Sequence, residues 1–113
     1  MHFARLPSNK VYFHDKNLLK NEKAISYFES VDKIMLVKEE DKHIVLCHYP
    51  LCDWYRKAYG SWHIYGHIHK NKEDVYEFMK HQERALNAGC MINNYAPASL
   101  NELIRNNEMF QEY

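Results

Sequence analysis

Two histidine-bearing segments combine residue types and spacings that suit metal binding. His67 and His69 stand two positions apart directly after Gly66, and His48 lies in the segment Cys47-His48-Tyr49-Pro50. In an extended backbone, residues two apart project from the same face, so the imidazoles of His67 and His69 are expected to point together. Imidazole is a ligand for Zn, Fe, Mn, Ni and Cu ions. If the fold brings His48 into the same pocket, these residues predict a divalent-metal site.

The spacing of these histidines alone also admits a structural interpretation. A His-x-His step arises by chance, and a single histidine at a strand end more often makes a structural hydrogen bond. His63 falls inside an expected strand and is expected to be packed there. The other histidines have no companion at a useful spacing and are expected to be surface or structural residues: His2, His14, His43 and His81.

Short strands and helices alternate along the chain and must position these histidines. Apolar runs at residues 34–37 and 44–47, separated by a polar turn at 39–41, predict a hairpin whose strands are covered on both faces. Other strands are expected at residues 62–65 and 84–88, with a short one at 11–13. Helices are expected at residues 21–30, 53–59 and 71–83, and from Ser99 onward.

Two of the expected helices carry specific predictions. The helix at residues 71–83 is expected to begin at Asn71 and to use Val75, Phe78 and Met79 as its apolar positions. The last helix begins with Ser99-Leu100-Asn101-Glu102, which matches a capping box. The alternation of strands and helices indicates an α/β fold, at the border with α+β.

The composition is that of a single soluble domain. The chain has 113 residues, 46% of them hydrophobic and 27% charged, with 15 basic and 15 acidic side chains. A net charge of zero disfavours non-specific binding to nucleic acid or to an anionic membrane. The three cysteines, without a Cys-x-x-Cys pair, argue for a reducing compartment. With no signal peptide and no apolar run long enough to span a bilayer, the expected location is cytoplasmic.

Four segments resemble one known family. They are Leu46-Cys47-His48-Tyr49-Pro50, Tyr65-Gly66-His67-Ile68-His69, Ala85-Leu86-Asn87-Ala88-Gly89, and the stretch from Tyr95-Ala96-Pro97 to Leu103. In order, spacing and strand context they resemble the C-terminal half of bacterial calcineurin-like metallophosphoesterases. The resemblance is strongest over residues 32–104. It implies half of a four-layer α-β-β-α sandwich within one domain covering residues 1–113.

The resemblance also implies a binuclear centre. His48 and His67 would bind one metal ion and His69 the other, with Mn, Fe, Zn or Ni as the class of ion. A water or hydroxide between the ions would attack the phosphorus of a phosphate ester. No catalytic residue beyond these ligands is assigned in this chain.

The sequence departs from the family upstream of these motifs. In the family, carboxylates and further ligands come from the upstream motifs Asp-x-His, Gly-Asp-x-x-Asp and Gly-Asn-His. The last two motifs require a glycine before Asp or Asn, and none of the three glycines in this sequence stands there. Asp41-Lys42-His43 spells the first motif but precedes its strand, so it is interpreted as a turn. A truncated or split phosphoesterase is therefore expected, completed by a homo-oligomer or by a chain that supplies the missing half. The alternatives are a non-catalytic metal-binding or interaction module, and a structural domain without metal.

Overall fold

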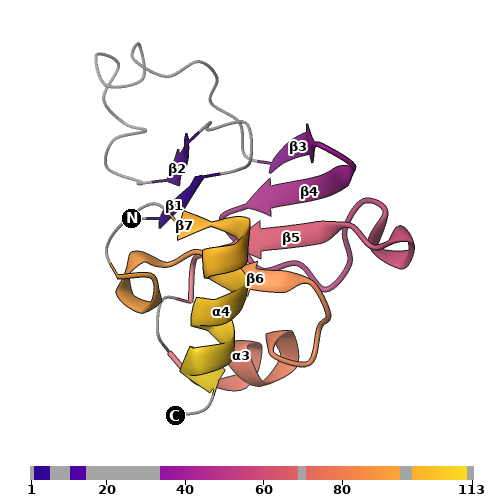
Figure 1. Ribbon diagram of the computed structural model, residues 1–113. Coiled ribbons are helices and arrows are strands. Elements are labelled where there is room, and N and C mark those ends of the chain that lie inside the picture. The colour runs from indigo at the N-terminus through magenta and orange to yellow at the C-terminus, as the bar shows by residue number, and fades with distance from the viewer. Residues whose placement is uncertain (1, 6–10, 15–33, 69–70, 95–97, 112–113) are drawn as a thin grey trace, which may run out of the picture.

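The computed structural model describes residues 2–5, 11–14, 34–68, 71–94 and 98–111, which form a small α/β domain (Figure 1). A four-stranded mixed sheet has the order β3-β4-β5-β6, and a three-stranded sheet has the order β2-β1-β7. The α/β class expected from the sequence is confirmed. The helix expected at residues 21–30 lies outside the described residues.

The strands and helices have the following bounds. The strands are β1 (His2–Arg5), β2 (Val11–His14), β3 (Ile34–Glu39), β4 (Lys42–Cys47), β5 (Trp62–Tyr65), β6 (Ala85–Asn87) and β7 (Ala98–Ser99). The α-helices are α3 (Asp74–Met79) and α4 (Leu100–Gln111), and 3-10 turns occur at η1 (Lys57–Tyr59) and η2 (Cys90–Ile92). The helix expected at residues 53–59 is thus only the turn η1.

The hairpin expected in the first half of the sheet is confirmed. Strands β3 and β4 pair antiparallel around a turn in which Glu40 has a positive φ of 56°. Successive residues Ile44 and Val45 of β4 point to opposite faces and are 1% and 2% exposed, so this strand is covered on both sides. The expectation is wrong for β3, where Ile34 and Leu36 are 54% and 58% exposed. Strand β3 is the edge of the described sheet, so it has a strand neighbour, β4, on one side alone.

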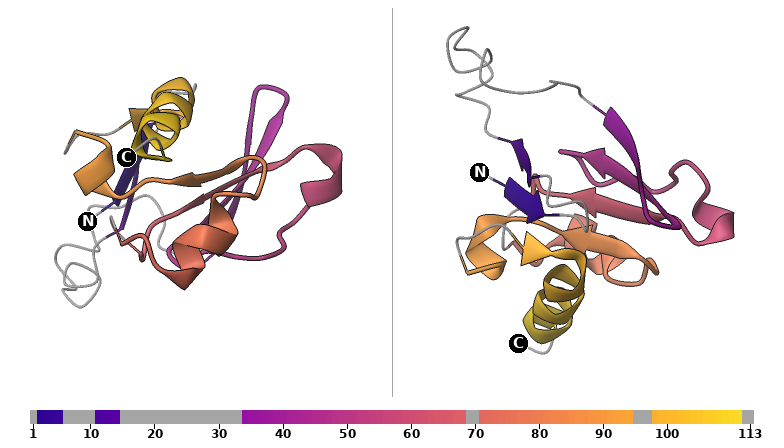
Figure 2. Two further views of the ribbon diagram at one scale, coloured as in Figure 1. Left: turned by 90° about the horizontal axis from the view of Figure 1, so that it is seen from below. Right: turned by 45° about the horizontal axis from the view of Figure 1, so that its top comes forward.

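The two helices pack on opposite faces of the four-stranded sheet. Ile64 and Leu86 share a buried core with Leu100 and Leu103 of α4, and β7 adds Ala98 to the same core. The other face carries a second cluster, in which Tyr65 packs with residues of α3. Figure 2 shows this arrangement from two further directions, with the strands of the sheet between the helices.

Helix α3 is shorter than expected, and of its three expected apolar positions Met79 alone is buried. It begins at Asp74, after Glu73 as its N-cap, rather than at Asn71. Val75 and Phe78 are exposed, whereas Tyr76 and Met79 are buried against Tyr65. Residues three apart lie on the same side of a helix. Tyr76 and Met79 therefore form the stripe that packs on the sheet, and Val75 and Phe78 form a neighbouring stripe that faces solvent.

Helix α4 begins at the capping box that the sequence predicts. The backbone N–H of Glu102 donates to the Ser99 hydroxyl at 3.2 Å, and the backbone N–H of Ser99 donates to the Glu102 carboxylate at 3.3 Å. This reciprocal pair satisfies two donors at the helix start. None of the helices in the described part of the chain combines the length and apolar character needed to cross a bilayer.

Candidate metal centre

The ends of two adjacent parallel strands bring His48 and the residue before His67 together. Strands β4 and β5 pair parallel, with Leu46 opposite Ile64. The pairing continues beyond the strand ends, because the backbone N–H of Gly66 donates to the carbonyl of His48 at 2.9 Å. Parallel strands present their carboxyl ends at one edge of the sheet, which is where ligands bind in α/β folds. The expectation that His48 and His67 meet at this edge agrees with the structure.

The two imidazoles are in direct contact. Nδ1 of His67 lies 3.3 Å from Nε2 of His48, and the ring planes cross at 78°. Two nitrogen ligands at about 2.0–2.1 Å from one tetrahedral zinc ion are separated by about 3.3–3.4 Å. The observed separation therefore suits two ligands of one cation. It equally suits a hydrogen bond in which one ring N–H donates to the lone pair of the other ring.

Tyr49 forms one wall beside this pair. Its ring lies 4.8 Å from that of His48 in an edge-on contact and 4.6 Å from that of His67, measured between centroids. Tyr49 remains 49% exposed. An aromatic ring therefore flanks both imidazoles on the solvent side of the strand ends.

The backbone at His67 differs from the extended geometry expected from the sequence. His67 has a positive φ of 24° and lies in a turn, which continues with the backbone N–H of Asn71 donating to the carbonyl of Ile68 at 3.0 Å. The extended backbone that the sequence argument assumed is therefore not observed at His67. His69, the third expected ligand, lies outside the described residues.

The donor set around the pair is incomplete in the described residues. No group of three or more His, Cys, Asp or Glu side chains is placed to hold a metal ion among them. Asp41 lies in the β3–β4 turn and His43 near the start of β4, whereas His48 follows the end of that strand. The interpretation of Asp41-Lys42-His43 as a turn agrees with this position. His48 and His67 can thus supply two ligands, and other groups must supply the rest.

A buried histidine holds the segment that carries His48. The backbone N–H of Leu51 donates to Nε2 of His63 at 3.0 Å, and Nδ1 of His63 lies 3.0 Å from the carbonyl of Val45. Burial lowers the pKa of His63 below its ordinary value of 6.5; the hydrogen bond to Val45 opposes this effect and the charge of Lys57 adds to it. The ring of His63 is therefore neutral near pH 7. The expectation that His63 is packed inside a strand is confirmed.

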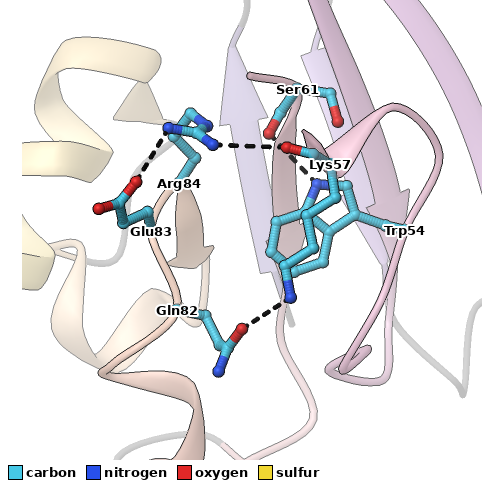
Figure 3. A network of polar contacts seen from close by, with 6 residues as sticks. All are labelled: Trp54, Lys57, Ser61, Gln82, Glu83 and Arg84. Carbon is cyan, nitrogen blue, oxygen red and sulfur yellow. Dashed lines mark hydrogen bonds and ion pairs between the residues drawn. The ribbon is translucent and has the colours of Figure 1, made fainter. Parts of the chain in front are cut away.

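The rest of the connection between β4 and β5 is fastened by a polar network (Figure 3). The Lys57 amine lies 4.5 Å from the centre of the Trp54 ring and donates to the side-chain oxygen of Gln82 at 2.7 Å. The Trp54 indole N–H donates to the carbonyl of Ser61 at 3.2 Å, and Arg84 donates to the carbonyl of Lys57 at 3.4 Å. These contacts tie the connection to the turn before β6. Parallel neighbouring strands are usually joined by an α-helix, whereas this connection contains the 3-10 turn η1.

Comparison with known proteins gives one weak likeness. No protein-family model matches the sequence, and no solved structure matches it. The chain is similar to "Uncharacterized protein MJ1445" of Methanocaldococcus jannaschii, with 27% identity over 74 residues, or 66% of this chain. Those residues cover 42% of that protein, so the chain spans less than half the length of this relative. The name of the relative states no activity.

The loop after β6 depends on three buried asparagines that sequence reasoning did not single out as a network. The side-chain oxygen of Asn107 accepts the backbone N–H of Asn87 at 2.8 Å. The Asn87 side chain accepts the N–H of Gly89, and Asn93 donates to the carbonyls of Asn87 and Gly89. The sequence signal was the Asn-x-Gly step at residues 87–89. Its partner on α4, Asn107, is 20 residues away and has no local signature.

Proposed function

We propose that this chain carries part of the metal centre of a calcineurin-like metallophosphoesterase, a hydrolase of phosphate esters. The observation that carries the proposal is the 3.3 Å approach of Nδ1 of His67 to Nε2 of His48 at the ends of adjacent parallel strands. The resemblance in motif order and spacing implies a ligand after each of these strands, which supports the proposal. His69 is the third ligand in this proposal.

The arrangement of layers supports the finer fold assignment. One face of the four-stranded sheet is covered by α3, and the other packs against α4 and Ala98 of β7 in the second sheet. In an α-β-β-α sandwich the two sheets share a core, and Ala98 of the second sheet lies in the same core as Ile64 and Leu86 of the first. We therefore include this architecture in the proposal.

The chemistry of the site follows from its ligands. Divalent ions of the Mn, Fe, Zn or Ni class suit imidazole, and such ions lower the pKa of bound water and offset phosphoryl charge. His48 and His67 would hold an ion through neutral nitrogens, and Tyr49 would limit water access from one side. Two adjacent cations repel each other unless anionic ligands lie between them. We propose that a second copy or another chain supplies the carboxylates that the described residues do not place here.

Phosphoesterase activity provides the test. The chain, purified without a polyhistidine tag, is assayed with bis-p-nitrophenyl phosphate and p-nitrophenyl phosphate in the presence of Mn²⁺. His67→Ala is expected to abolish turnover, and His81→Ala, which removes an exposed imidazole in another turn, is the matched control. Turnover that survives His67→Ala with unchanged rate would refute the assignment.

A non-catalytic metal-binding module is the second candidate, and the incomplete donor set among the described residues favours it. Metal analysis distinguishes the two. Bound metal that depends on His48 and His67, without hydrolysis of either ester, would assign the module to this chain by itself and leave hydrolysis to an assembly with the chain that supplies the carboxylates. A protein that binds no metal and hydrolyses neither ester would be the structural domain.

A further inference from the structure

The hydrogen bonds of His63 fix both its tautomer and its charge. A carbonyl can only accept and a backbone N–H can only donate, so the contacts with Val45 and Leu51 require a proton on Nδ1 and a lone pair on Nε2. A doubly protonated ring would turn a second N–H toward the N–H of Leu51. His63 is 0% exposed, so a ring nitrogen that loses its partner pays a desolvation cost.

These bonds act on the segment that carries His48. The segment is attached at both of its ends. At its start, the N–H of Gly66, the residue after β5, donates to the carbonyl of His48 at 2.9 Å. At its end, the N–H of Leu51 donates to His63 of β5 at 3.0 Å. The first attachment fixes the backbone position of His48. The second fixes the direction in which the chain leaves it.

His63 contacts three segments of the chain around the connection between β4 and β5. The Trp54 ring packs on the imidazole with 5.1 Å between centroids and 37° between planes, and Trp54 itself is held by the carbonyl of Ser61. The imidazole therefore contacts β4 through Val45, the outgoing segment through Leu51 and the returning segment through Trp54. Among the described residues, the Leu51 amide has no other side chain as its acceptor.

We propose that His63 is a positioning residue of the two-histidine site: by accepting from Leu51, its Nε2 atom fixes the segment that directs the His48 ring toward His67. The metal-binding part of this inference rests on the proposed function. The positioning of the two rings does not rest on it, because their 3.3 Å contact is a feature of the fold at the ends of β4 and β5.

Two substitutions separate positioning from simple burial. In His63→Asn the amide group reaches the place of Nδ1 and can donate to Val45, but nothing reaches Leu51. In His63→Gln the amide oxygen reaches the place of Nε2 and can accept from Leu51, while the bond to Val45 is lost. Each variant keeps one hydrogen bond and loses one, so both are expected to lose similar stability.

The variants are compared by hydrogen exchange of the Leu51 amide and by Mn²⁺ and Co²⁺ affinity. His63→Asn is expected to accelerate Leu51 exchange at least tenfold and to weaken metal affinity about tenfold, at the lower end of the range for residues that orient ligands. His63→Gln is expected to keep both values near those of the parent protein. Equal losses of affinity in both variants, or no loss in either, would overturn the proposal.

Two measurements keep the inference testable if metal binding or folding fails. If the parent protein binds no metal, the proposed function fails, and the proton–proton contact between the His48 and His67 rings becomes the readout. That contact must be lost in His63→Asn and kept in His63→Gln. If the variants do not fold, the ¹⁵N shifts of His63 in the parent protein decide: a proton on Nδ1 supports the proposal, and a proton on Nε2 overturns it.

Discussion

Nδ1 of His67 approaches Nε2 of His48 to 3.3 Å across 19 positions of sequence. The approach follows from the parallel pairing of β4 and β5, whose ends carry the two residues. The first prediction concerns what this pair binds. A divalent ion that binds only the folded protein, at 100 times its dissociation constant, should raise the free energy of unfolding by about 2.7 kcal/mol.

Thermal unfolding with added Mn²⁺ or Zn²⁺ measures this effect, and a chelator should reverse it. The stabilisation should disappear in His48→Ala and in His67→Ala and persist in His81→Ala. An equal stabilisation in all three variants would assign the binding to another part of the chain.

The second prediction is a pH dependence that arises from His63. Burial lowers the pKa of His63 below 6.5 in the folded protein. As pH falls below about 6.5, the unfolded imidazole takes up a proton while the folded one stays neutral, so the free energy of unfolding decreases. The decrease should end once pH passes below the folded pKa of His63. Above about pH 7 this residue should contribute no pH dependence.

Urea unfolding at several pH values checks this prediction by comparing the parent protein with His63→Gln. The difference in the free energy of unfolding between the two should shrink as pH decreases from 7. A difference that stays constant between pH 7 and pH 5 would contradict the lowered pKa.

The third prediction concerns the start of α4. Ser99→Ala removes the hydroxyl that accepts from the N–H of Glu102, and should lower the free energy of unfolding by about 0.5–2 kcal/mol. Asn101→Ala is the matched control, because Asn101 is exposed in the first turn of the helix. Urea unfolding of both variants gives the comparison, and equal stabilities would argue against the capping role.

The fourth prediction concerns the buried asparagines. Asn107→Ala leaves the backbone N–H of Asn87 without its acceptor, which should cost about 1–3 kcal/mol of stability. Asn106→Ala removes one partly buried bond, to the side chain of Asn93, and should cost about 0.5–1.5 kcal/mol. The order of the two midpoints in urea checks the prediction. A larger loss in Asn106→Ala would show that the network is not centred on Asn87.

Local signals explain why much of the fold could be predicted. The apolar runs around a short polar turn specify the β3–β4 hairpin, and the Ser99 capping box specifies the start of α4. Strand β1 carries no such signal: it is four residues long and pairs with β7, whose residues Ala98 and Ser99 lie far along the chain. In α3 the apolar positions define two stripes, and only packing against Tyr65 decides in favour of Tyr76 and Met79.

Some features of the candidate site could likewise be predicted from the sequence, and others could not. The meeting of His48 and His67 could be predicted because each follows a strand and parallel strands end together. The positive φ of His67 could not, since that conformation is uncommon for any residue other than glycine and no local signal marks it here. The bond between Leu51 and His63 was also beyond prediction, because a single histidine inside a strand does not indicate which backbone group it will meet.

The position of Trp54 gives the protein an optical reporter of its own. A cationic amine over the indole and a hydrogen bond from the indole N–H both affect fluorescence, and both depend on the connection from β4 to β5 staying in place. Detachment of that connection would expose a ring that is now buried and should shift its emission to longer wavelengths. With Trp62 replaced by phenylalanine, stopped-flow spectroscopy could then time the opening of this segment without any added label.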